Sequence, residues 1–206
     1  VWTKEDIEKG QAKYKNTRAT RIFNKSYELY HLDQAKPVIQ KTHEVYLMEG
    51  FMDVIAAYRA GHVNAVASMG TALTPEHVNR LRKLTKKIVL TYDGDKPGQN
   101  AIAKSLELLK DFNVEIVRVP EQMDPDEFIK AEGAEAFEKR LEAATDSFMF
   151  RVSIASGDFP MDEPQGQNRF FERCAQYLLE LSDELERNLY IEAIVKEYRR
   201  YGISVE

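Results

Sequence analysis

The chain has 206 residues, 43% of them hydrophobic, and a formal net charge of −5, which predicts one domain of ordinary size plus a smaller subdomain. Its single cysteine, Cys174, excludes an intramolecular disulfide, and four scattered histidines offer no zinc-ligand spacing. No apolar run reaches the roughly 18 residues of a membrane span, so we expect a cytoplasmic protein with no membrane partner.

The first feature along the chain is a basic segment. Gly10 to Lys25 carries five basic residues and no acid. Lysines interleaved with Tyr14 suit a single strand of nucleic acid, because lysines take phosphates and an aromatic ring stacks a base. A solvated loop is the alternative, since most charge runs are solvated. Residues 26–36 are then predicted to form a single helix entered through Ser26.

From Glu44 onward, short apolar runs alternate with amphipathic stretches. The predicted strands cover 45–50, 64–68, 87–92 and 114–119. The predicted helices cover about 52–61, 75–84, 97–109 and 127–133, with Thr74 capping the second and Asp126 the last. Strands separated by helices of this length predict an α/β fold with a parallel sheet and helices on both of its faces.

Beyond Thr145 the sequence is helical throughout. It contains "SFMFRVSIA", a loop from Gly157 to Gly166, and two amphipathic helices split near Ser182. Apolar residues recur at spacings of three and four, which predicts a buried stripe of Phe170, Phe171, Cys174, Tyr177, Leu178 and Leu181. We therefore expect a small helical bundle without chemistry of its own, in which Cys174 is packed rather than reactive.

Acidic residues follow three of the predicted strands. Glu49 ends the first, Asp93 and Asp95 end the third, and Asp124 and Asp126 follow the fourth. Ligands of an open parallel sheet bind at this edge, and oxygen-only ligands suit Mg²⁺ or Mn²⁺. Asp126 as a helix cap, and Asp53 as a charge near a helix start, have equally good structural explanations.

Other loop chemistries do not match. A calcium loop beginning at Asp93 needs a glutamate at its twelfth position, which is Lys104. The sequence contains neither of the glycine-rich phosphate loops, and it has no serine nucleophile elbow. The acids therefore remain the candidates that carry chemistry.

The motifs "LMEGFMDV", "ASMGTALT", "TYDGDKPG" and "MDPDEFI", in this order and spacing, resemble the Toprim domain of bacterial DnaG-type replicative primases. The upstream stretch "KYKNTRATRIFNKSYELYHLDQAK" is similar to the segment before that domain, although Arg18 departs from the family pattern. The resemblance is strong over residues 13–141 and looser in the helical tail.

This resemblance implies DNA-directed synthesis of RNA primers from ribonucleoside triphosphates on a single-stranded DNA template. It implies that magnesium or manganese, in more than one ion, is held by Glu49, Asp93, Asp95, Asp124 and Asp126. Glu49, Asp93 and Asp95 are the expected catalytic residues, with Glu49 either a ligand or the carrier of the hydroxyl proton. Asp53 is expected to contact the metal-binding residues rather than the metal itself. Lys13, Tyr14, Asn16 and Lys25 match template-binding positions, and Gly70 and Thr71 are candidate phosphate contacts.

The resemblance also predicts three parts: a basic segment and helix (1–43), a Toprim core (44–144) and a helical bundle subdomain (145–206). The chain is expected to be a fragment, without a zinc site and without the domain that binds the replicative helicase. Two alternatives remain open, a Toprim nuclease or phosphotransferase and a non-catalytic module that binds nucleic acid or nucleotides.

Overall fold

A six-stranded sheet forms the centre of the molecule in the computed structural model, which describes residues 17–92, 96–120 and 123–202. The strand order is β1-β3-β2-β4-β5-β6. The strands are β1 (Leu29–Tyr30), β2 (Glu44–Met48), β3 (Ala65–Ser68), β4 (Lys87–Tyr92), β5 (Asn113–Arg118) and β6 (Thr145–Asp146). The four central strands are parallel, which confirms the predicted α/β class, and the two short edge strands pair antiparallel.

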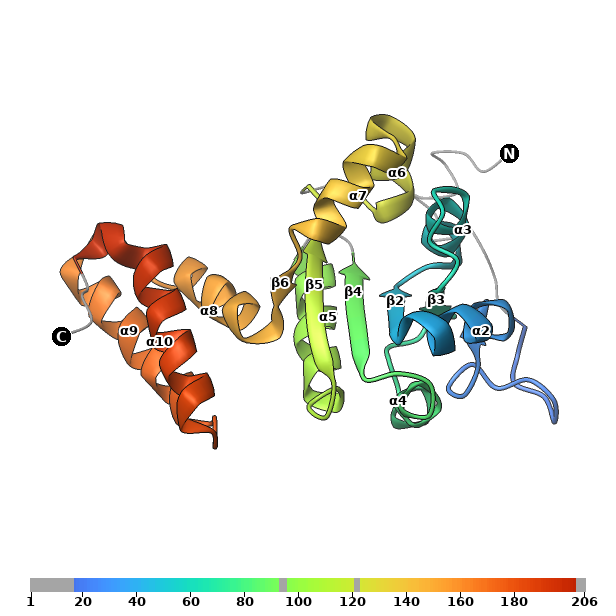
Figure 1. Cartoon of the computed structure of the whole chain (residues 1–206), viewed down its shortest axis with the longest axis horizontal. Helices are drawn as coiled ribbons and strands as arrows, with labels where there is room; N and C mark the ends of the chain where they lie inside the picture. The colour runs from blue at the N-terminus through green and yellow to red at the C-terminus, as the bar shows by residue number, and fades with distance from the viewer. Residues whose placement is uncertain (1–16, 93–95, 121–122, 203–206) are drawn as a thin grey trace.

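Helices cover both faces of this sheet (Figure 1). One face carries α2 (Leu32–Thr42), α4 (Pro75–Arg82) and α5 (Lys96–Leu108), and the other carries α3 (Phe51–Arg59), α6 (Pro125–Glu132) and α7 (Ala134–Glu142). Successive strand residues point to opposite faces, so Leu47 packs in the first core and Met48 in the second. A parallel sheet covered in this way needs apolar residues on both faces, which is why its strands are continuous apolar runs.

The helix predicted over residues 26–36 is wrong. The chain instead makes a turn, in which the N–H groups of Tyr27 and Glu28 donate to the carbonyl of Asn24, and then pairs with β3 as strand β1. His31 follows in the left-handed conformation with φ 66°, and its Nδ1 lies 3.0 Å from the carbonyl oxygen of Ala65. Helix α2 therefore starts at Leu32 and continues past Pro37 to Thr42.

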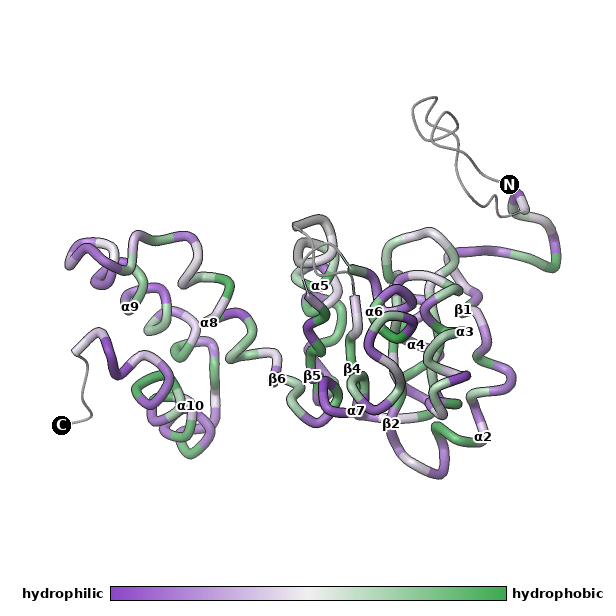
Figure 2. Tube along the Cα trace, turned by 90° about the horizontal axis from the view of Figure 1, so that it is seen from above, coloured by the Kyte–Doolittle hydropathy of each residue, from purple (hydrophilic) through white to green (hydrophobic). Residues whose placement is uncertain are grey.

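The predicted helical bundle lies beyond the β6 edge of the sheet (Figures 1 and 2). It consists of α8 (Ser147–Gly157), α9 (Pro164–Leu179), α10 (Glu184–Tyr198) and the short 3-10 helix η1 (Arg199–Tyr201). Asp146 belongs to β6 and also caps α8, because its carboxylate accepts from the N–H groups of Phe148 and Met149. Asp146 thus joins the sheet to the bundle, and Phe150 of α8 adds a second connection by packing into the core of the sheet.

The bundle has its own apolar core. The predicted stripe on α9 is confirmed, with Phe170 and Cys174 buried against Ile194 and Tyr198 of α10. Burial raises the pKa of the Cys174 thiol to about 11, so the thiol is packed and protonated, as expected. In the part of the chain that the structure describes, every helix is too short or too polar to cross a membrane.

Candidate active site at the carboxyl edge of the sheet

The carboxyl ends of the central strands lie level with one another. Met48 at the end of β2 pairs with Thr91, and Tyr92 at the end of β4 pairs with Arg118 at the end of β5. Glu49 follows Met48 directly, and its side chain is exposed at this edge. The register therefore brings the ends of β2, β4 and β5 together, as the sequence predicts.

Asp53 connects two of the loops at this edge. It is 4% exposed, and its Oδ2 accepts from the N–H of Gly50 at 3.0 Å, which closes the start of α3. Its Oδ1 accepts from the N–H of Asp126 at 3.2 Å, in the first turn of α6. A Cβ on Gly50 would lie 2.9 Å from Asp53 Oδ2, so any other residue at this position would require the carboxylate to shift. Asp53 thus connects the start of α3, which follows Glu49, with the first turn of α6.

Asp124 and Asp126 occupy the start of α6. Asp124 is the N-cap and accepts from the N–H of Glu127 at 2.7 Å, so the prediction of Asp126 as the cap is wrong. The reason is Pro125, whose missing N–H suits the first helical position and leaves the preceding residue as the cap. Asp126 is 9% exposed, and its Oδ2 lies 2.5 Å from Nζ of Lys130. That ion pair raises the pKa of the Lys130 ammonium.

The remaining predicted ligands and most of the predicted template residues lie outside the described residues. These are Asp93, Asp95, Lys13, Tyr14 and Asn16. Within residues 17–92, 96–120 and 123–202, no three acidic, histidine or cysteine side chains lie close enough together to hold a metal ion. Glu49, Asp124 and Asp126 therefore do not form a metal site by themselves. The acids at this edge are nevertheless an oxygen-only donor set, which fits magnesium or manganese.

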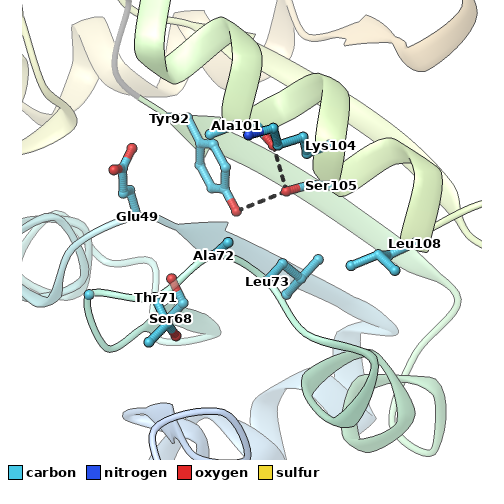
Figure 3. Close-up of a pocket in the computed structure, with 11 residues that line it drawn as sticks. Glu49, Ser68, Thr71, Ala72, Leu73, Tyr92, Ala101, Lys104, Ser105 and Leu108 are labelled. Carbon is cyan, nitrogen blue, oxygen red and sulfur yellow. Dashed lines mark hydrogen bonds between the residues drawn. The ribbon is translucent and has the colours of Figure 1, made fainter.

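A cavity of about 770 Å³ opens beside Glu49 (Figure 3). Its walls come from the β3–α4 loop and from α5, with Tyr92 standing between Glu49 and Ser105. The hydroxyl of Tyr92 lies 3.4 Å from Ser105 Oγ, which donates to the carbonyl of Ala101. Burial, with a contribution from the charge of Glu49, raises the pKa of Tyr92 to about 12, so this hydroxyl stays protonated.

Gly70 and Thr71, the candidate phosphate contacts, line this cavity. Gly70 has φ 70°, a backbone conformation that favours glycine, so the loop can turn its backbone toward the cavity. The hydroxyl oxygen of Thr71 is buried, and it has no hydrogen-bond partner among the described residues. A buried polar atom of this kind is costly unless a partner arrives, which favours a polar ligand at this wall.

The sequence did not single out Tyr92, Lys104 or Ser105, although all three line the cavity. One signal was available, because Ser105 is a polar residue on the apolar face of a predicted helix, three positions after Ile102. Tyr92 could be identified only by the structure, since a tyrosine at the end of a strand is usually part of the core.

Lys25, the one predicted template residue that the structure describes, is half-buried in the turn before β1. Its carbonyl oxygen lies 2.9 Å from Nε2 of His77 on α4. The same helix begins at Thr74, directly after the loop that carries Gly70 and Thr71. Helix α4 therefore supports both the wall of the cavity and the turn of residues 24–28, which we call the basic turn after Lys25.

Two family profiles match the chain. One, described as Toprim-like, matches residues 46–129. The other, described as the DnaB-helicase binding domain of primase, matches residues 148–199. The second match overturns the expectation that the helicase-binding region is absent, because it covers the three helices of the bundle. The resemblance of the bundle sequence to the primase family is looser than that of the Toprim motifs. Its amphipathic pattern alone indicated only packing.

Curated relatives are DNA primases. The DNA primase of Lactococcus lactis is 47% identical over 196 residues, which are 95% of this chain and 30% of that protein. The DNA primase of Enterococcus faecalis is 37% identical over 198 residues, with 94% of this chain and 32% of that protein covered. The chain thus spans about a third of the length of these relatives.

Solved structures give the same result. The RNA polymerase domain of Mycobacterium tuberculosis primase DnaG, in complex with a double-stranded DNA oligomer with a 6-nucleotide overhang, matches with TM-score 0.79 and 29% identity over 90% of this chain and 60% of that one. The Aquifex aeolicus primase structure of the zinc-binding and RNA polymerase domains matches with TM-score 0.71 and 31% identity, over 97% of this chain and 46% of that one. The chain therefore belongs to the DnaG-type bacterial primases and corresponds to the Toprim-containing part of their RNA polymerase domain.

Proposed function

We propose that this chain carries the site at which a primase joins ribonucleotides on a single-stranded DNA template. The observation that carries the proposal is the geometry at the edge of the sheet. There β2 and β4 end in register, and Glu49 lines a cavity of about 770 Å³. Two comparisons support it, the Toprim-like profile and the identity to DNA primases. Chromosome replication places such an enzyme in the bacterial cytoplasm.

In this proposal, Glu49, Asp93, Asp95, Asp124 and Asp126 hold magnesium or manganese. Bound at this edge, the ions orient the primer 3′-hydroxyl and the incoming triphosphate and neutralise the charge that develops on the phosphates. Asp53 holds the backbone of Asp126 in place through its hydrogen bond. Thr71 offers its hydroxyl to a phosphate oxygen, and Gly70 offers its backbone N–H. Lys13, Tyr14, Asn16 and Lys25 contact the template.

Incorporation of labelled ribonucleotides on single-stranded DNA, with Mn²⁺, tests this function. We expect template-dependent product from the native chain and a loss of about a hundredfold or more in Glu49→Gln, since a preorganised electrostatic group contributes that order of rate. Glu107→Gln is the matched control, because Glu107 is an exposed carboxylate whose partner among the ion pairs of the described residues is Lys110, three residues further along the chain.

The other outcomes select the alternatives. Degradation of the single strand, lost in Glu49→Gln, identifies a Toprim nuclease. Binding without either reaction identifies a non-catalytic module. Either result contradicts primer synthesis by this chain.

We further propose that the bundle contacts the replicative helicase. The profile match over residues 148–199 supports this partner. Leu185 and Leu189 on α10 are 70% and 58% exposed and lie on one face of the helix, four residues apart, which suits an apolar contact. The double variant Leu185→Ser, Leu189→Ser should lose co-migration with the helicase in gel filtration, whereas Asn188→Ser on the same helix should keep it. Equal co-migration of both variants contradicts this contact surface.

A further inference from the structure

Helix α4 holds the basic turn through its main chain. Four successive carbonyl oxygens, those of residues 25–28, each accept a hydrogen bond from a side chain of this helix or of its N-cap, Thr74. Thr74 Oγ1 donates to Ser26 at 2.6 Å, and Arg80 Nη1 donates to Tyr27 at 3.0 Å. His77 Nε2 donates to the other two, at 2.9 Å to Lys25 and 3.1 Å to Glu28. We call Thr74, His77 and Arg80 the carbonyl clamp.

His77 is the centre of the clamp. Its ring is completely buried, and Nδ1 accepts from the N–H of Thr74 at 3.3 Å. That bond requires the neutral ring to carry its proton on Nε2, which is the atom that faces the two carbonyls. Burial also lowers the pKa of His77, which keeps the ring neutral. The ring thus spans the turn and the helix cap in one defined tautomer.

Arg80 adds a second kind of contact. Its Nη1 lies 2.5 Å from Glu28 Oε2, and its guanidinium lies 4.9 Å from the centre of the Tyr27 ring. Tyr27 and Glu28 are therefore held by main chain and side chain together. The turn has little freedom to change its direction relative to α4.

The other end of this support reaches the cavity. Thr74 is three residues from Thr71, and the loop between them lines the cavity beside Glu49. We propose that the carbonyl clamp positions Lys25 relative to this cavity, so that a template strand bound by the basic turn is held in register with the site of nucleotide addition. His77 is the positioning residue of this arrangement. The inference rests on the proposed function, because it takes Lys25 to contact the template.

Trypsin tests the clamp directly. Trypsin must capture the carbonyl of Lys25 to cut the Lys25–Ser26 bond, and His77 occupies that carbonyl in the native chain. We expect His77→Leu to accelerate this cleavage about fivefold to tenfold, since loss of a buried hydrogen bond opens a segment by that order. His77→Gln should restore native protection, because its amide can donate to the same carbonyls. Cleavage at Arg21–Ile22, where Ile22 is 96% exposed, serves as the internal reference and should not change.

A stability control separates the clamp from general loosening. The control variant is Val78→Ala. Val78 lies next to His77 on α4, but its side chain packs into the core of the sheet. The two variants are compared at temperatures equally far below their own melting temperatures. Under these conditions, cleavage after Lys25 should stay slow in Val78→Ala. Equal cleavage rates in the native chain and His77→Leu, or fast cleavage in Val78→Ala, overturn the clamp.

Binding of single-stranded DNA then tests the positioning role. In the native background, Lys25→Ala should make the log-log dependence of binding on salt shallower by about 0.7, the value of one phosphate contact on a single strand. In the His77→Leu background, the same substitution should change the slope little. An equal change of slope in both backgrounds shows that the clamp does not position Lys25 and overturns the proposal. If the native chain binds no single-stranded DNA, the proposed function fails instead, and the trypsin rates still decide whether the clamp exists.

Discussion

Asp53 illustrates how a single buried carboxylate organises the site. It accepts from the N–H of Gly50 and from the N–H of Asp126, which lies 73 residues after Asp53 in the sequence. A carboxylate oxygen is a strong acceptor, and two such bonds stabilise the start of α3 and the start of α6 at once. The sequence showed only an acid near a helix start, for which a favourable charge was a sufficient explanation.

We predict that Asp53→Ala lowers the free energy of unfolding by at least about 2 kcal/mol, since each N–H left without a partner costs about 1 to 3 kcal/mol. Asp53→Asn should lose less, because one acceptor oxygen remains. Urea denaturation measures both variants. A loss below about 0.5 kcal/mol in Asp53→Ala, the size of an ordinary surface substitution, means that Asp53 does not carry this connection.

At the scale of elements, the sequence predicted the central strands well. Strand β4 has the predicted bounds, 87–92, because a continuous apolar run followed by Asp-Gly can hardly be anything else. Helix α4 starts where Thr74 and Pro75 predicted it, since a side-chain cap and a proline at the first helical position are local signals. Local chemistry decides these boundaries, so a single sequence is enough to find them.

The segment from Ser26 to Lys36 was mispredicted because distant contacts decide its structure. Strand β1 exists only through pairing with β3, and the turn before it is held by side chains of α4 about fifty residues away. Neither contact leaves a periodic signal in the segment itself. For the same reason the walls of the cavity, which come from four separate segments of the chain, could not be predicted from the sequence, whereas Glu49 at a strand end could be.

Helix α4 also predicts how stability depends on pH. Burial is the largest effect on the pKa of His77 and lowers it, and the charge of Arg80 lowers it further. The carbonyls of Lys25 and Glu28 and the charge of Glu76 oppose this, but the pKa remains lowered. The folded chain then binds fewer protons than the unfolded chain, whose histidines titrate near about 6.5. Stability contributed by this histidine is therefore present above that pH and is lost as the pH falls below it. Burial lowers the pKa of His62 as well, so it contributes in the same direction.

We expect the urea concentration at the midpoint of unfolding to decrease when the pH is lowered from 7.5 to 5.5. His77→Gln should reduce that decrease. His62→Gln is the matched comparison and should remove only the part of the decrease that His62 contributes. The carboxylate pKa values that the structure lowers, such as that of Glu180, lie below this window and do not contribute to it. A native midpoint that stays constant or rises on acidification contradicts the neutral, buried state of both rings.

At the scale of the whole molecule, three apolar clusters share one chain, one on each face of the sheet and one in the bundle. The bundle has its own apolar cluster, but Phe150 of α8 packs into the core of the sheet, and Asp146 joins the two parts at the β6 edge. Glu49 and the cavity belong to the sheet, whereas the exposed leucines of α10 belong to the bundle. The proposed nucleotide chemistry and the proposed helicase contact thus lie in different parts of the chain, so variants in one part should leave the other function intact.

The central claim is that the carboxyl edge of the sheet holds divalent ions, and melting with and without Mn²⁺ tests it most directly. At about 100 times its dissociation constant, an ion stabilises the folded chain by about 2.7 kcal/mol, which for a chain of this size raises the melting temperature by roughly 5 to 11 °C. We predict this rise in the native chain and in Glu107→Gln, and its loss in Glu49→Gln and Asp93→Asn. The same rise in Glu49→Gln and Asp93→Asn, or no rise in the native chain, contradicts the account.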